Sequence, residues 1–129
     1  MGEISRDLMK ALLIIAHGSR KQSSNDEVAK LATAVAAQES GFELIEHAFL
    51  ELTTPKVPDG IQSLISQGAT DVVILPYFLA AGFHVADDLP KLLSDAQDQY
   101  PDVRFKLLKH LGAADRMPNW IIQQSEQTG

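Results

Sequence analysis

Two histidines in segments rich in small residues are the strongest candidates for chemistry in this chain. His17 lies in the segment 16–20, Ala-His-Gly-Ser-Arg, and His84 lies in the segment 79–85, Leu-Ala-Ala-Gly-Phe-His-Val. An imidazole side chain can bind a divalent metal ion or accept a proton near neutral pH. His17 alone fits two interpretations equally: a functional group, or a histidine that only hydrogen-bonds to its own loop.

Charged residues near these histidines have two interpretations each. Glu51 could bind a proton, a metal ion or a substrate N–H group, or it could be an ordinary surface carboxylate. Asp87 and Asp88 follow His84 closely. They could orient its imidazole through hydrogen bonds, but we favour the start of a helix, where negative charge is stabilised. Arg20 supplies a permanent positive charge beside His17, and Lys21 follows it.

The remaining histidines are weaker candidates. His47 lies four residues before Glu51 in an apolar segment, so we expect it deeper in the fold, with a structural role. His110 follows the last predicted strand and is a further candidate for the functional edge.

Composition and motifs exclude several classes of chemistry. The chain contains no cysteine, which excludes disulfides, thiolate catalysis, zinc–thiolate sites and iron–sulfur clusters. There is no glycine-rich phosphate loop and no G-x-S-x-G motif. The His-Gly pair is typical of phosphohistidine phosphatases, but Ala16 stands where they need an arginine. The net charge of −6 argues against non-specific binding to nucleic acid.

Short apolar runs alternate with amphipathic segments in the order β-α-β-α-β-α-β-α. We predict strands at 12–16, 43–52, 71–77 and 103–108, and a loop at 79–86. A capping box of Ser24 and Glu27 begins the first helix. Thr54 caps the second helix, Pro55 is its first residue, and Gly68 follows its end. The third helix is centred on 89–96, and the last helix spans about 115–125.

This alternation predicts a single α/β domain: an open parallel sheet of about four strands flanked by helices. We expect residues 1–9 to be a flexible lead-in and residues 10–129 to form the domain. Ligands bind beyond the carboxyl ends of parallel strands, so the loops after Ala16, Leu52, Tyr77 and Leu108 should share one rim. No signal peptide or membrane segment is evident, which predicts a cytoplasmic protein without a membrane partner.

Three motifs together resemble the short form of the CbiX sirohydrochlorin chelatases, which are class II tetrapyrrole chelatases. They are Ala-His-Gly-Ser-Arg at 16–20, Phe-Leu-Glu-Leu at 49–52 with a proline shortly after, and Gly-Phe-His-Val-Ala-Asp-Asp-Leu-Pro at 82–90. The resemblance covers the chain from about Lys10 to Met117, and the Leu-Gly pair at 111–112 also fits. The pair Ala80-Ala81 is a departure from the family pattern.

The resemblance implies a chelatase-like fold and a lyase that inserts a divalent metal into sirohydrochlorin with release of two protons. Cobalt, for cobalamin biosynthesis, is the first choice, and iron, for siroheme, is the alternative. Nickel also fits such ligands. Two other interpretations remain: a non-catalytic carrier of metal or tetrapyrrole, and a structural domain. No permanently bound cofactor is expected, and the short form implies a homodimer.

The resemblance also implies roles for individual residues. His17 would be a proton acceptor and metal ligand, and His84 would be the second metal ligand. Glu51 would contact the substrate. So would the segment that contains Leu79, Ala80, Ala81, Gly82, Phe83 and His84. Sirohydrochlorin carries many carboxylates, so a local basic patch is expected, and Arg20 is nearest to the site.

Overall fold

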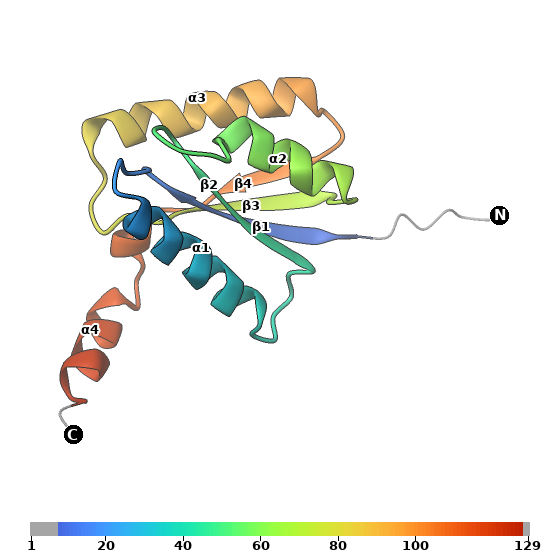
Figure 1. Ribbon diagram of the computed structural model, residues 1–129. Coiled ribbons are helices and arrows are strands. Elements are labelled where there is room, and N and C mark those ends of the chain that lie inside the picture. The colour runs from blue at the N-terminus through green and yellow to red at the C-terminus, as the bar shows by residue number, and fades with distance from the viewer. Residues whose placement is uncertain (1–7, 128–129) are drawn as a thin grey trace.

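The chain folds into a four-stranded parallel sheet with helices on both faces (Figure 1). The computed structural model describes residues 8–127, apart from the side chains of Phe83 and His84. The elements are β1 (Lys10–Ala16), α1 (Gln22–Ala36), β2 (Leu44–Phe49), α2 (Val57–Ser66), β3 (Asp71–Pro76), α3 (Phe83–Gln99), β4 (Arg104–Leu107), a 3-10 turn η1 (Leu111–Ala113) and α4 (Met117–Ser125). The strand order is β2-β1-β3-β4. The predicted α/β fold and its alternation are confirmed.

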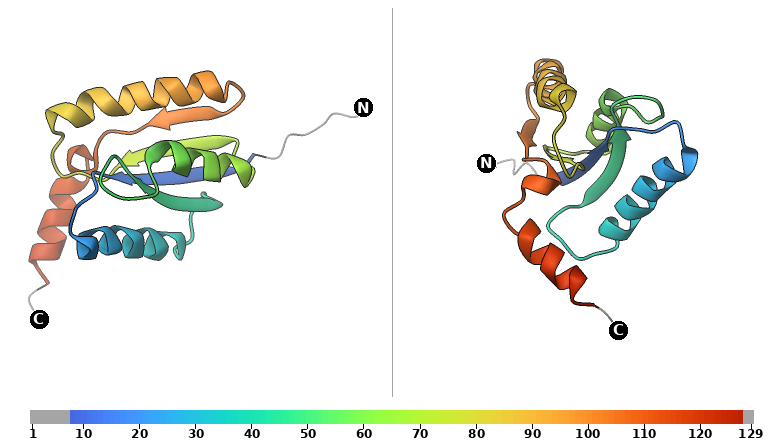
Figure 2. Two further views of the ribbon diagram at one scale, coloured as in Figure 1. Left: turned by 45° about the horizontal axis from the view of Figure 1, so that its top comes forward. Right: turned by 90° about the vertical axis from the view of Figure 1, so that its left-hand side faces the viewer.

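The central strand β1 is buried on both faces, which explains its continuous apolar run. Side chains alternate across a strand. Leu13 and Ile15 therefore pack with α2 and α3, while Leu12 and Ile14 pack with α1. Two views in Figure 2 show α2 and α3 on one side of the sheet and α1 on the other.

Two predicted helix starts are wrong. Helix α1 begins at Gln22 after Lys21 and has no side-chain cap. Ser24 already lies in its first turn and donates its N–H to the Lys21 carbonyl, so the capping box with Glu27 does not form. Helix α2 begins at Val57, not at Pro55. Residues 55 and 56, just before it, pair with the end of β2, where the Phe49 N–H donates to the Pro55 carbonyl at 2.8 Å.

Two further boundaries differ near the predicted rim. Strand β2 ends at Phe49, so residues 50–52 belong to a loop. Helix α3 begins at Phe83, so residues 83–86, predicted as loop, form its first turn. Gly82 is extended, and its carbonyl accepts the Ala86 N–H at 3.3 Å. Asp87 and Asp88 therefore follow the first turn instead of starting the helix.

The predicted position of Gly68 just past the second helix is confirmed. Gly68 follows α2 with a φ of +106°, as expected for a glycine just past a helix end. Its N–H donates to the Ile65 carbonyl at 3.0 Å. Strand β1 begins at Lys10, while residues 1–7 of the predicted lead-in lie outside the described residues. In the part of the chain that the structure describes, no helix is long and apolar enough to span a membrane.

One buried amide ties the loop after β1 to α1. Asn25 is 5% exposed, and it is the only buried polar or charged side chain among the described residues. Its Oδ1 accepts the Ser19 N–H at 2.9 Å, and its Nδ2 donates to the Ser19 carbonyl at 2.8 Å. Both hydrogen bonds hold the backbone of the loop that follows β1.

We predict that Asn25→Ala lowers the free energy of unfolding by about 1–3 kcal/mol, because it leaves two backbone groups of Ser19 without partners. Urea unfolding measures the change. The matched control is Gln22→Ala, which removes an exposed bond to Asp26 on the same helix; we expect it to stay within about 0.5 kcal/mol. An equal effect of both variants would contradict the role of Asn25.

Candidate functional site

The loops after β1 and β2 stay paired beyond the ends of their strands. The Leu50 N–H donates to the Ala16 carbonyl, and the Glu51 N–H donates to the His17 carbonyl, both at 3.0 Å. These two bonds continue the parallel pairing of β1 with β2. As a result, His17 and Glu51 lie side by side at the predicted rim.

Gly18 permits this close approach. Its φ is +99°, a conformation that glycine adopts without strain. A Cβ atom at this position would overlap the backbone carbonyl of Glu51. Leu52 also has a positive φ, of +72°, where the second loop turns back toward α2. The backbones of both loops are therefore fixed against each other.

The imidazole of His17 and the carboxylate of Glu51 face each other. The distance from His17 Nε2 to Glu51 Oε2 is 3.6 Å. His17 Nδ1 lies 3.1 Å from the Gly18 carbonyl oxygen. A carbonyl oxygen only accepts hydrogen bonds, so Nδ1 carries the hydrogen and Nε2 is the nitrogen left to accept a proton or bind a metal. The side chains are 52% and 58% exposed, so ligands can reach both.

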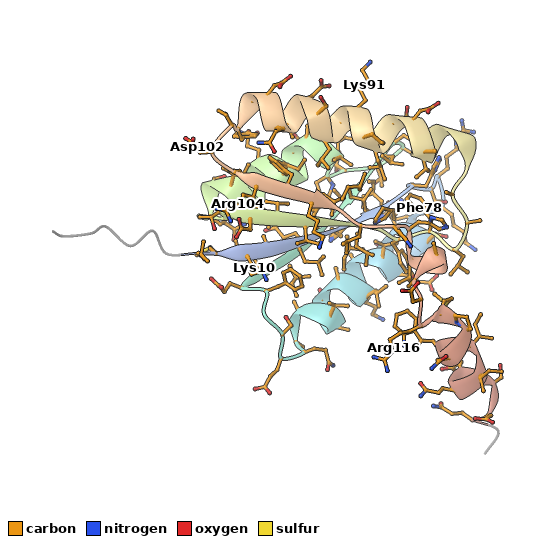
Figure 3. The ribbon with its side chains drawn as sticks, turned by 180° about the vertical axis from the view of Figure 1, so that it is seen from behind. Lys10, Phe78, Lys91, Asp102, Arg104 and Arg116 are labelled. Carbon is orange, nitrogen blue, oxygen red and sulfur yellow. The ribbon has the colours of Figure 1, made fainter. Side chains whose placement is uncertain are left out.

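A pocket of about 550 Å³ opens beside this pair, and we call it the site pocket. The rim loops contribute His17, Leu50 and Glu51, and α3 contributes Val85, Asp88, Lys91, Leu92 and Asp95. Four of the α3 residues repeat at helical spacing along one face. Lys91 projects from α3 with its amino end pointing outward (Figure 3).

Sequence reasoning missed Lys91 and Asp95 and considered Asp88 only beside His84. The signal was the spacing of Asp88, Lys91 and Asp95, at intervals of three and four residues. It becomes visible only when α3 is known to begin before Val85. The predicted loop at 79–86 concealed it.

The other predicted site residues divide between neighbouring regions. Residues 79–82 form an exposed loop in which Leu79 is 75% exposed. Ala81 and His110 line a smaller apolar pocket of about 200 Å³, and Val85 borders both pockets. Arg20 is exposed on the loop after His17. The side chains of Phe83 and His84 lie outside the described residues, so their predicted roles stay predictions.

His47 lies within β2 below the rim. It is half-buried, and its ring meets that of Phe49 edge-to-face, with centroids 5.4 Å apart. This contact supports the structural role expected for it. Among the described side chains, no group of three or more histidines and carboxylates is placed to hold a metal ion.

Known proteins of similar sequence are named as sirohydrochlorin chelatases, either for cobalt or for iron. The chain is 35% identical over 92 residues to a sirohydrochlorin cobaltochelatase of Methanocaldococcus jannaschii, which covers 71% of this chain and 64% of that protein. It is 32% identical over 104 residues to the chloroplastic sirohydrochlorin ferrochelatase of Arabidopsis thaliana. That match covers 78% of this chain and 44% of the plant protein.

A solved structure of similar fold is the sirohydrochlorin chelatase SirB from Bacillus subtilis subspecies spizizenii in complex with cobalt. It matches with a TM-score of 0.80 and 26% identity, over 94% of this chain and 51% of that one. The part of these relatives that the chain matches ranges from 44% to 64% of their own length. The family model named CbiX matches residues 11–128, and the chain therefore belongs to the CbiX family.

Proposed function

We propose that this chain is a sirohydrochlorin chelatase, a lyase that forms metal–nitrogen bonds. The observation that carries the proposal is the pair of His17 Nε2 and Glu51 Oε2, 3.6 Å apart beside the site pocket. The reaction is sirohydrochlorin plus a divalent metal ion giving metallosirohydrochlorin and two protons. The names of similar proteins support both the substrate and the reaction.

The geometry of the pair suits two ligands of one metal ion. Histidine nitrogen and carboxylate oxygen each bind a divalent metal at about 2.1 Å, which places them roughly 3.4 Å apart at a tetrahedral angle. The observed separation is 3.6 Å. The hydrogen bond from Nδ1 to the Gly18 carbonyl orients the imidazole, as the outer partner of a metal-bound histidine commonly does.

The same two groups can take up the protons that the reaction releases. The macrocycle loses two N–H protons as its nitrogens bind the metal ion. When the ion leaves the protein for the ring, His17 Nε2 and the Glu51 carboxylate lose their metal partner and become proton acceptors. The imidazole keeps its hydrogen on Nδ1, so Nε2 remains the basic nitrogen.

Residues around the pair provide contacts for a flat, polycarboxylate substrate. The exposed loop at 79–82 offers small and apolar groups to the ring face. Arg20 and Lys91 are the cations we assign to its carboxylates. Cobalt is our first choice of metal, and iron is the alternative, as the names of the two relatives suggest. A cytoplasmic location stays a prediction from the sequence.

The protein is mixed with sirohydrochlorin and, in separate anaerobic reactions, Co²⁺, Fe²⁺ or Ni²⁺. We expect a change in visible absorbance that reports metal insertion faster than the uncatalysed reaction. His17→Ala and Glu51→Gln should each slow insertion by about 100-fold or more, as the loss of a positioned base does. Glu27→Gln, an exposed carboxylate on α1, is the matched control. If the protein accelerates insertion of none of the three metals over the uncatalysed rate, the chain is not a chelatase on its own, and the carrier interpretation is favoured.

His84 is proposed as the second metal ligand, and metal binding tests it without substrate. His84→Ala and His17→Ala should each weaken Co²⁺ binding at least about tenfold in a calorimetric titration. Loss of a residue that only hydrogen-bonds to a metal ligand already lowers metal affinity by about tenfold or more. His110→Ala, in the neighbouring pocket, should bind as the parent does. Unchanged affinity in His84→Ala would remove His84 from the ligand set.

We also propose that two copies of the chain pair to enclose the substrate, since one lobe leaves a face of a large flat ligand in water. Light scattering should give twice the 14.1 kDa mass of the chain. A preparation that is wholly monomeric at the assay concentration and fully active would refute the pairing.

A further inference from the structure

Two glycines of this structure have neighbouring backbone where a Cβ atom would lie. Among the glycines that the structure describes, Gly18 would overlap the Glu51 carbonyl and Gly112 would overlap the Leu79 carbonyl. At the other described glycines, the nearest contacts of an added Cβ atom would be side chains, or nothing within 4 Å. The first contact holds the loop that carries Glu51. The second contact involves the loop between β3 and α3, which leads directly to His84.

The turn η1 lies next to the loop between β3 and α3 (Figure 1). The Gly112 N–H donates to the Phe78 carbonyl at 2.9 Å, and the absence of a Cβ atom leaves room for the Leu79 carbonyl. Among the described glycines only Gly18 and Gly68 have a positive φ, so an alanine could adopt the backbone conformation of Gly112. The contact with Leu79 is therefore what requires glycine at this position.

The loop beyond this contact has few restraints of its own. Residues 79–82 are all exposed. Within the part of the chain that the structure describes, none of their N–H groups donates a hydrogen bond. Phe78 packs against the core before the loop, and Val85 is buried in the core after it. The loop therefore spans two fixed points, the Gly112 contact at one end and Val85 at the other.

The turn η1 is the more firmly held side of the contact. Residues 110–114 are half-buried, and the Ala113 N–H closes the turn by donating to the His110 carbonyl at 2.9 Å. The chain just before the turn stays bonded to β3 through the Leu108 N–H, which donates to a β3 carbonyl at 3.0 Å. Segments with few buried contacts and hydrogen bonds move most easily. A side chain at position 112 would therefore displace the exposed loop.

We propose that Gly112 is a positioning residue for the loop at 79–82 and, through this loop, for His84. The inference rests on the proposed function, which gives His84 its part in metal binding. The Gly112 contact fixes where the chain leaves β3, and α3 begins at Phe83, just beyond the loop. Displacement of Leu79 would move both the first turn of α3 and the loop groups assigned to the substrate.

A label on the loop tests the positioning without any metal ion. The chain contains no cysteine, so Ala80→Cys, at an exposed position, accepts a single nitroxide spin label. We expect Gly112→Ala to change the mobility of the label, measured by electron paramagnetic resonance, because the added Cβ atom displaces Leu79. Gly41→Ala is the matched control, since a Cβ atom there meets nothing within 4 Å. Equal label spectra in the two variants, both folded by circular dichroism, would overturn the proposal.

Co²⁺ affinity tests whether the displacement acts through His84. We expect Gly112→Ala to weaken Co²⁺ binding by about tenfold, the order of effect seen when a residue that orients a metal ligand is lost. In a His84→Ala background the same substitution should have no further effect, whereas in a His17→Ala background the loss should remain. An equal loss in every background would indicate general loosening of the domain and would overturn a role through His84.

A measurement on the unmodified chain decides the matter if Gly112→Ala does not fold. Coupling between two sites is reciprocal, so bound Co²⁺ must stabilise a contact that favours Co²⁺ binding. Hydrogen exchange of the Gly112 N–H, followed by mass spectrometry, should slow several-fold when Co²⁺ is added. The Gly68 N–H, near Met9 before β1, should exchange at one rate with and without Co²⁺. Unchanged exchange at Gly112 would contradict the proposal.

The chelatase assay reports separately. A chain without chelatase activity whose label still responds to Gly112→Ala would refute the proposed function and keep the positioning of the loop. An active chain whose label and Co²⁺ affinity are indifferent to Gly112→Ala would keep the function and remove Gly112 from it.

Discussion

The contact between the backbone of Gly18 and the carbonyl of Glu51 is the constraint on which the site depends. Parallel pairing of β1 with β2 brings both chains to the same edge of the sheet, and two hydrogen bonds carry that pairing past the strand ends. Only a residue without a Cβ atom lets the two loops lie this close. The separation of His17 and Glu51 is thus set by backbone geometry, and Asn25 anchors the first loop from α1.

The rest of the site comes from a helix that belongs to a different part of the chain. Helix α3 packs on the sheet through Val85 and Leu89, and the same packing turns Asp88 and Asp95 toward the rim loops. A side chain on a packed helix keeps its direction, because moving it would displace buried neighbours. The pocket therefore combines two loops fixed by the sheet with one helical face fixed by the core.

The alternation of apolar runs predicted the fold, the parallel sheet and the shared rim, because burial on both faces leaves a strong pattern in β1. It did not predict where α2 and α3 begin. Lys56 bridges to Phe49, and this backbone contact with the end of β2 overrides the helix signal of Thr54 and Pro55. Residues 83–86 contain no cap residue, so their helical state depends on packing. The candidates His17 and Glu51 were predictable from strand ends, whereas Lys91 and Asp95 required the true start of α3.

The exposure of the His17–Glu51 pair bears on how one lobe could work. With both side chains more than half exposed, water competes for any metal ion and screens its attraction to the carboxylate. The same pair would act far more strongly in a site that excludes water, because the effective dielectric constant falls. Nothing within the described residues provides that cover over the rim, while α4 extends from the same end with an exposed apolar face. The His17–Glu51 pair and the exposed apolar face of α4 therefore lie at the same end of the lobe.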